Sequence, residues 1–201
     1  MTFEDKSQGE VLETRPRQRS LSHNEPRFTV SQYLFQLTGV DLMPSDGFRT
    51  GYLAWDLLGE IGMDRQPWPT EKPCCSWLCV CLGNKKTGGR LISGRTRNNA
   101  SRAAKIFRLA AYALARSQTA LGAFYRCLKA RLGPAKALTA TAHTLAKIVY
   151  NMLTYGKAYV DRGGEYYEQQ YRARVIKNLT RRAKQLGFEL VPVTATPAVG
   201  Q

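Results

Sequence analysis

The stretch PAKALTATAHTLAKIVYNMLTY, Pro134 to Tyr155, decides the fold prediction. Its apolar residues recur every three or four positions, which is the spacing of one face of an α-helix: Leu138, Ala142, Leu145, Val149 and Met152. Proline is favoured in the first helical turn, so Pro134 marks the start of this helix. We therefore predict a long helix that buries this stripe in the core of the fold.

The neighbouring segments show the same periodicity. A helix after Ala100 is indicated by Ala103, Phe107, Ala110 and Leu114, and TALGAFYRCLKARLG forms a separate helix that ends at Gly133. A last helix is predicted from Glu165 to Leu186, with its inward face formed by Tyr171, Val175, Leu179, Ala183 and Leu186. Its outer face carries six cations: Arg172, Arg174, Lys177, Arg181, Arg182 and Lys184. Residues 100–187 are thus a basic helical part.

Near the front of the chain, the sequence pattern predicts two short helices on either side of the turn MPSDGFRT. This layout resembles a helix-hairpin-helix. The predicted fold class is all-α, with a helix-hairpin-helix-like front (27–82), then a basic loop (83–99) and a bundle of long helices. Residues 1–26 are polar and lack sustained periodicity, so we predict a flexible tail there. The domain is expected to span residues 27–192, with a second tail at 193–201.

Charge is distributed unevenly along the chain. Residues 1–82 hold 8 Lys and Arg against 11 Asp and Glu, whereas residues 83–187 hold 22 basic residues against 3 acidic ones. A surface of this kind favours a polyanionic partner, because neutralised phosphates release counterions. No apolar run approaches the ~20 residues of a membrane span, and no signal peptide is evident. We expect a soluble, cytoplasmic protein that is not associated with a membrane.

The basic loop GNKKTGGRLISGRTRNN, residues 83–99, concentrates this charge without any acidic residue. The predicted nucleic-acid contacts are its cations and hydroxyls, together with two cations just beyond it: Lys85, Lys86, Arg90, Ser93, Arg95, Thr96, Arg97, Arg102 and Lys105. A hydroxyl that attacks a phosphodiester needs cations around the phosphate, and Thr87, Ser93 and Thr96 are the candidates in the loop. The alternative, that these residues only bind phosphate, stays open.

The cysteines predict no metal site. Four of the five lie between Cys74 and Cys81 in the pattern CC-x3-C-x-C, which differs from the paired spacing of structural zinc sites, and no histidine is close in sequence. We therefore expect reduced thiols, a structural role for His143, and no metal or cofactor in this chain.

Five blocks of the sequence, in order, resemble a known family: NEPRFTVSQYLFQLTGVDL, LLGEIGMDRQPWPTEK, SWLCVCLGNKKTGGRLISGRTRNN, LGAFYRCLKARLGPAKALTATAHTLAKIVYNMLTYGKAYVD and YYEQQYRARVIKNLTRRAKQLGFELVP. The family is the insertion-sequence transposases of the one-hundred-ten, one-hundred-sixteen and nine-hundred-two group, also called DEDD transposases or bridge-RNA-guided recombinases. The resemblance is to their C-terminal domain and covers roughly residues 24–192.

The resemblance implies a bacterial, nucleoid-associated protein of DNA transposition that works as an oligomer, with a C-terminal serine that becomes linked to DNA. An element-encoded guide RNA pairs with the DNA, and an N-terminal domain supplies four acids that bind Mg²⁺. The register with SWL places Thr87 at the serine position. Nothing here corresponds to the acidic domain, so we expect an N-terminally truncated chain with defective chemistry. It would bind DNA, and also the guide RNA, as a homo-oligomer or as the partner of an intact transposase. The alternative is a non-catalytic nucleic-acid-binding remnant that modulates an intact transposase or has no selected function.

Overall fold

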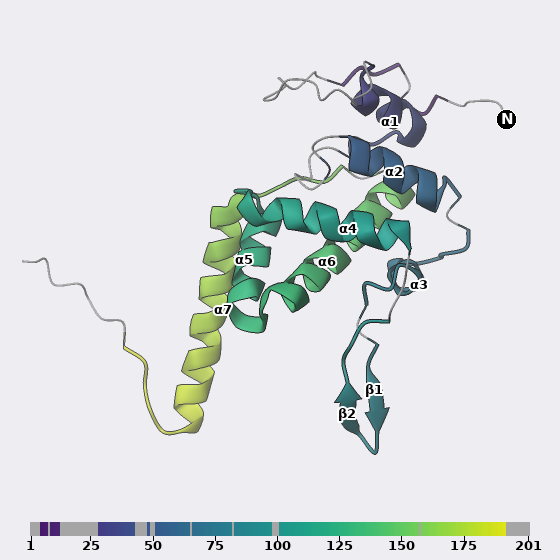
Figure 1. The fold of residues 1–201 in the computed structure, drawn as a ribbon. Helices are drawn as coiled ribbons and strands as arrows, with labels where there is room; N and C mark the ends of the chain where they lie inside the picture. The colour runs from purple at the N-terminus through teal and green to yellow at the C-terminus, as the bar shows by residue number, and fades with distance from the viewer. Residues whose placement is uncertain are drawn as a thin grey trace, which may run out of the picture.

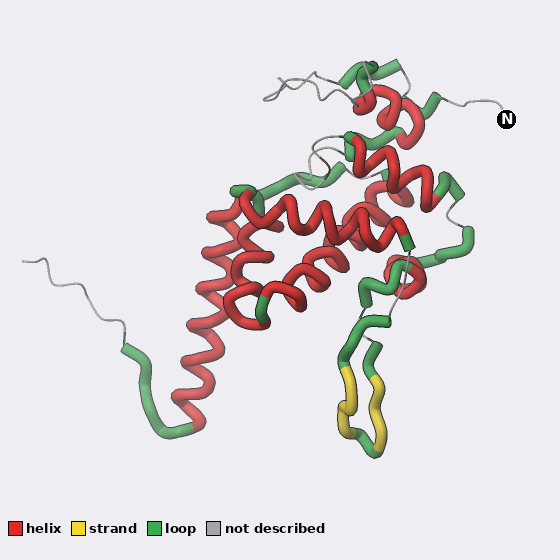
Figure 2. The backbone as a smooth tube through the Cα atoms, in the orientation of Figure 1, coloured by secondary structure: helices red, strands yellow, loops and turns green. Residues whose placement is uncertain are grey.

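The computed structural model describes residues 5–7, 9–12, 28–42, 48, 51–64, 66–81, 83–97, 101–156 and 158–191. The fold is all-α, as predicted, and it also contains one small β-hairpin that was not predicted (Figures 1 and 2). In chain order the elements are α1 (Val30–Thr38), α2 (Tyr52–Ile61), α3 (Glu71–Trp77), β1 (Lys85–Thr87), β2 (Arg90–Ser93), α4 (Arg102–Ala113), η2 (Leu114–Arg116), α5 (Ala120–Leu132), α6 (Pro134–Tyr155) and α7 (Gly163–Gln185). Within these described ranges, no helix combines the length and the apolar composition that crossing a bilayer requires.

The core forms around α6, which packs against α3, α4 and α5. The stripe predicted for this helix is largely confirmed, because Ala142, Leu145, Val149 and Met152 are buried and Leu138 is half-buried. The facing stripe of α4 is buried in full at Ala103, Phe107, Ala110 and Leu114. Ser101 caps α4 and Thr119 caps α5, each by accepting a hydrogen bond from a backbone N–H in the first turn. Burial of these apolar faces is the main stabilisation of the bundle.

Of the two front helices, α2 packs on α4 and α1 packs on α2, at the end of the bundle opposite the free end of α7 (Figure 1). The predicted turn between them lies outside the described residues except for Phe48, which is buried and packs edge-to-face on Phe107 with centroids 6.1 Å apart. Part of the expected flexible tail contacts α1. The Lys6 N–H donates to the Gln36 carbonyl at 2.8 Å, and the Leu12 N–H donates to the Gln32 side chain at 3.1 Å. Residues 13–27 and the predicted tail at 193–201 lie outside the described residues.

The segment predicted as a basic loop contains a two-stranded antiparallel hairpin, which projects from the bundle (Figure 2). The prediction of irregular structure over 83–99 is therefore wrong for Lys85–Ser93. The reason is local, because two consecutive glycines between strand-like segments favour a two-residue hairpin turn.

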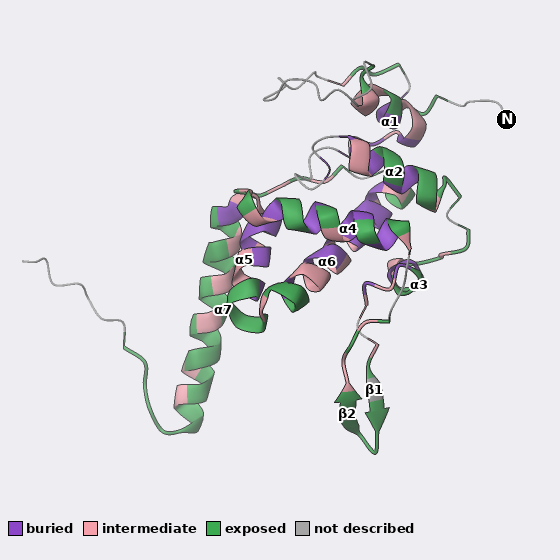
Figure 3. Cartoon of the chain, in the orientation of Figure 1, coloured by how far each residue is buried: buried purple, intermediate pink, exposed green. Residues whose placement is uncertain are grey.

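Helix α7 extends well beyond the bundle, and this changes the expectation for its inward face (Figures 1 and 3). Its first turns pack on α5, where Phe124 and Tyr167 meet edge-to-face with centroids 5.8 Å apart. Farther along, Leu179 is 52% exposed and Leu186 is 70% exposed, so these two residues do not face a core in this chain. Periodicity predicts which side of a helix is apolar, and the length of α5 decides how much of that side is covered.

Candidate nucleic-acid interface

The hairpin is specified by the sequence KKT-GG-RLIS. Gly88 has φ of 55° and Gly89 has φ of 77°, and a type I′ turn requires positive φ at both central residues. The strands pair Thr87 with Arg90 and Lys86 with Leu91. The register then shifts, so that Lys85 pairs with Ser93 and Ile92 is the extra residue of a β-bulge. The turn places Thr87 and Arg90 at the tip.

The root of the hairpin is closed by a backbone contact that requires glycine. The Gly83 N–H donates to the Arg95 carbonyl oxygen at 3.0 Å. A Cβ at position 83 would lie 2.8 Å from that same oxygen, closer than real Cβ contacts. Arg97 also approaches this point, with its Cγ 3.9 Å from the same Cβ position. Gly83 thus lets the two arms meet and brings two of the predicted arginines together at the root.

The cations of the hairpin are exposed and uncompensated. Lys86, Arg90, Arg95 and Arg97 are all exposed, and within the part of the chain that the structure describes none of them forms an ion pair. The sequence has no acidic residue between Glu71 and Asp161. Lys85 occupies the first position of β1, and its side chain lies outside the described structure.

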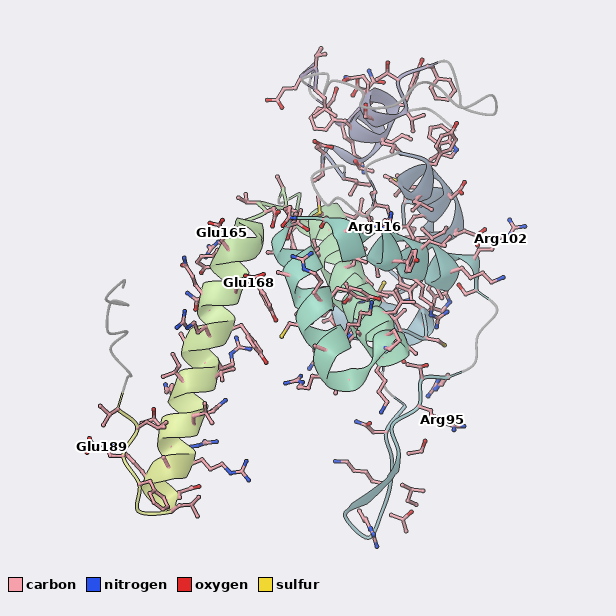
Figure 4. The ribbon with its side chains drawn as sticks, turned by 60° about the vertical axis from the view of Figure 1, so that its left-hand side comes forward. Arg95, Arg102, Arg116, Glu165, Glu168 and Glu189 are labelled. Carbon is pink, nitrogen blue, oxygen red and sulfur yellow. The ribbon has the colours of Figure 1, made fainter. Side chains whose placement is uncertain are left out.

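The predicted contacts beyond the hairpin are on α4. Arg102 and Lys105 are exposed there, and the side chain of Arg102 points away from the bundle in Figure 4, as does Arg95 near the hairpin root. Arg102 lies 3.4 Å from a carboxylate oxygen of Glu60 on α2, but 81% of its side chain is exposed. An exposed ion pair of this kind contributes little to the stability of the fold, so Arg102 can readily exchange Glu60 for a phosphate. Arg102 is therefore still a candidate phosphate ligand.

The three hydroxyl candidates differ in their surroundings. Ser93 is half-buried, and its Oγ accepts a hydrogen bond from the Arg95 N–H at 3.4 Å. Thr96 is also half-buried. Thr87 is exposed, and its hydroxyl makes no hydrogen bond among the described residues. Thr87 is therefore the candidate that a phosphodiester reaches most directly.

A second cationic surface lies on α7. All six cations of its predicted outer face are exposed: Arg172, Arg174, Lys177, Arg181, Arg182 and Lys184. The labelled glutamates Glu165, Glu168 and Glu189 lie near the two ends of this helix in Figure 4. The protruding half of α7 is therefore almost purely basic, and it is separated from the hairpin by the bundle (Figure 1).

Sequence reasoning missed one cluster, at the hairpin root. The ligand atoms of Cys75, Cys81 and His143 all lie within 4.8 Å of one another, and Cys81 Sγ is 3.6 Å from His143 Nε2. The sequence shows no histidine near the cysteines because 62 residues separate the last two. Packing of α3 on α6 brings them together.

Burial controls the ionisation of this cluster. It raises the pKa of the Cys75 thiol to about 12 and also raises the pKa of Cys81. Burial and the nearby Lys147 lower the pKa of His143. Lys147 lies 3.1 Å from Glu71, and this hydrogen bond lowers the pKa of Glu71. At neutral pH the cation-free cluster therefore contains neutral thiols and a neutral imidazole.

No protein-family model, curated protein or solved structure shows a significant match to this chain. The acid-free stretch between Glu71 and Asp161 offers no carboxylate for Mg²⁺ at the hairpin, so the residues present there do not fit a magnesium centre.

Proposed function

We propose that this chain is a nucleic-acid-binding domain of a DNA transposase that acts at the bacterial nucleoid. The observation that carries the proposal is the projecting hairpin, whose described cations are exposed and have no acidic neighbour along the sequence. A two-stranded ribbon of this kind fits along a nucleic-acid groove with its cations at phosphates. DNA is the main partner, and the resemblance to bridge-RNA-guided transposases adds a structured guide RNA and an oligomer.

Thr87 is the proposed nucleophile position. Attack of its Oγ on phosphorus would form a threonine–phosphate ester as the bond to the leaving deoxyribose oxygen breaks. Arg90, its cross-strand partner, is placed to stabilise the negative charge on the non-bridging oxygens. The hydroxyl proton of Thr87 must pass to a general base. The sequence around Thr87 has no acidic residue, so this base must come from elsewhere. In the family this chemistry requires acids from another domain or subunit.

A second function, binding without chemistry, is favoured by the identity of residue 87. The β-methyl of threonine restricts its rotamers and crowds an attacking oxygen in a way that serine does not. The hairpin could then hold element DNA or RNA and modulate an intact transposase. Both functions share the same basic surface, and they differ in whether a covalent adduct forms.

The binding experiment tests what the two functions share. Purified chain is titrated with duplex DNA and with a structured RNA at several salt concentrations. We expect affinity to fall steeply, with a log–log slope of about −0.9 for each phosphate neutralised on duplex DNA. Affinity that stays constant between low and physiological salt would contradict the proposal.

A further inference from the structure

The cysteine–histidine cluster at the hairpin root is not used by the proposed function. We infer that Cys75, Cys81 and His143 form a Zn²⁺ site that fastens the root of the hairpin to α6. Each residue comes from a different part of the fold, namely α3, the segment that enters the hairpin, and α6. A cation held by all three would cross-link these parts.

The distances suit tetrahedral zinc. With Zn–S of about 2.3 Å and Zn–N of about 2.0 Å, tetrahedral geometry places a ligand sulfur and nitrogen about 3.5 Å apart. The Cys81 Sγ and His143 Nε2 atoms are 3.6 Å apart, and the third ligand atom lies within 4.8 Å of both. A displacement of no more than about 1.3 Å would bring the most distant pair to tetrahedral spacing.

The backbone after α3 is bent in a way that forms this cluster. Cys79 has φ of 52° and is the one described non-glycine residue in the left-handed region. Such a conformation is unfavourable for a residue with a side chain. The turn is held by the Cys79 N–H donating to the Ser76 carbonyl at 3.1 Å and the Val80 N–H donating to the Cys75 carbonyl at 3.3 Å. It directs Cys81 back toward Cys75.

The donor set favours zinc among common cations. Thiolate and imidazole are the ligands of Zn²⁺, whereas Mg²⁺ and Ca²⁺ take oxygen ligands. Two thiolates balance the charge of Zn²⁺, and the neighbouring Lys147 is paired with Glu71, so the whole cluster is close to neutral. The fourth position falls to water or to Cys79, two residues before Cys81.

The test uses the full chain, reduced and freed of metal, with Zn²⁺ and Co²⁺ as probes. We expect one Zn²⁺ per chain, and a Co²⁺ complex with the intense visible bands and thiolate charge-transfer absorption of a tetrahedral site. Zn²⁺ affinity is measured by competition with a chromophoric chelator. Cys81→Ser and His143→Asn change half-buried residues and should each weaken binding by at least about tenfold. Cys127→Ser, another half-buried thiol on α5, is the matched control and should bind as the parent does.

Circular dichroism establishes that each variant is folded before its affinity is compared. A chelator should lower the Tm of the parent and leave that of folded His143→Asn unchanged. The inference is overturned if the folded, reduced parent takes up no Zn²⁺, or if Cys81→Ser and His143→Asn bind Zn²⁺ as well as the parent does. The Cys79→Ser variant identifies the fourth ligand. If its Co²⁺ complex has weaker thiolate charge-transfer absorption than the parent, a third thiolate has been lost and the fourth ligand is Cys79. If the spectra are unchanged, the fourth ligand is water. None of these outcomes depends on DNA binding.

Discussion

Thr87 and Arg90 are cross-strand partners, the last pair before the Gly88–Gly89 turn. Side chains of paired residues in an antiparallel ladder lie on the same face, so a hydroxyl and a guanidinium stand together at the tip of the hairpin. Both are exposed. A phosphate that reaches the tip therefore meets a cation and a hydroxyl at once, which is the relationship on which the proposed chemistry depends.

The identity of residue 87 should control covalent chemistry. In an assembly supplied with the acidic domain, Mg²⁺ and guide RNA, Thr87→Ser should form more protein–DNA adduct than the parent, because the β-methyl is gone, and Thr87→Ala should form none. Denaturing electrophoresis of labelled DNA measures the adduct. Ser93→Ala is the control and should retain the parent level, since Ser93 Oγ is engaged by the Arg95 N–H. An adduct that survives Thr87→Ala would exclude Thr87 as the nucleophile.

Gly83→Ala should open the root of the hairpin. The added methyl would lie 2.8 Å from the Arg95 carbonyl, so the contact that closes the root must lengthen. Overpacking of this kind typically costs about 1–3 kcal/mol, and here we expect it as disorder of the hairpin and weaker DNA binding. Gly59→Ala is the matched control, because a Cβ there meets nothing within 4 Å and α2 favours alanine. Equal DNA affinity of the two variants would show that root closure is unimportant.

Tyr150→Phe should destabilise the bundle without affecting DNA binding. The buried Tyr150 hydroxyl donates to the Trp68 carbonyl at 2.6 Å and joins α6 to the segment before α3. Loss of such a bond, with the carbonyl left unpaired, typically costs about 1–3 kcal/mol in the free energy of unfolding. Urea denaturation measures it. Tyr112→Phe, at a residue that is 66% exposed, should change stability by less than about 0.5 kcal/mol. The prediction fails if the two substitutions cost the same.

Gly122→Ala should be the most damaging single-methyl change in the helical part. Its Cβ would lie 2.6 Å from the Ser117 hydroxyl and 2.8 Å from the Leu114 carbonyl, at the tight junction of η2 and α5. Because backbone atoms line this site, relaxation requires α5 to move, and we expect a loss of at least about 2 kcal/mol. Thermal unfolding measures the loss of stability, with Gly59→Ala as the control variant. An unchanged Tm in Gly122→Ala would contradict the packing described here.

The parts of the fold that the sequence predicted are those set by local periodicity. The stripe of α6 and that of α4 are mostly or wholly buried as expected, since long helices with one apolar face have few alternatives. Leu179 and Leu186 show the limit, because periodicity cannot say whether a facing element extends far enough to cover them. The hairpin could have been predicted from the Gly88–Gly89 pair between strand-like segments.

The candidate site also has a part that could be predicted from the sequence and a part that could not. Its cations are contiguous in sequence and could be identified from composition. The cluster of Cys75, Cys81 and His143 could not, because it depends on the packing of α3 on α6 and on the left-handed turn at Cys79. The register with SWL already favours Thr87 over Ser93, and the structure adds the pairing of Thr87 with Arg90 and the hydrogen bond at Ser93.

The central claim is that the hairpin is the phosphate-binding surface, and the salt dependence of duplex binding tests it most directly. We compare the triple variant Lys86→Gln, Arg90→Gln and Arg95→Gln with a charge-matched control in which three exposed cations of α5 and α6 are replaced: Lys129→Gln, Arg131→Gln and Lys136→Gln. In the hairpin variant, the slope of log affinity against log salt concentration should become shallower by about 3. In the control it should become shallower by less than about 1. Equal slopes for the two variants would contradict the account.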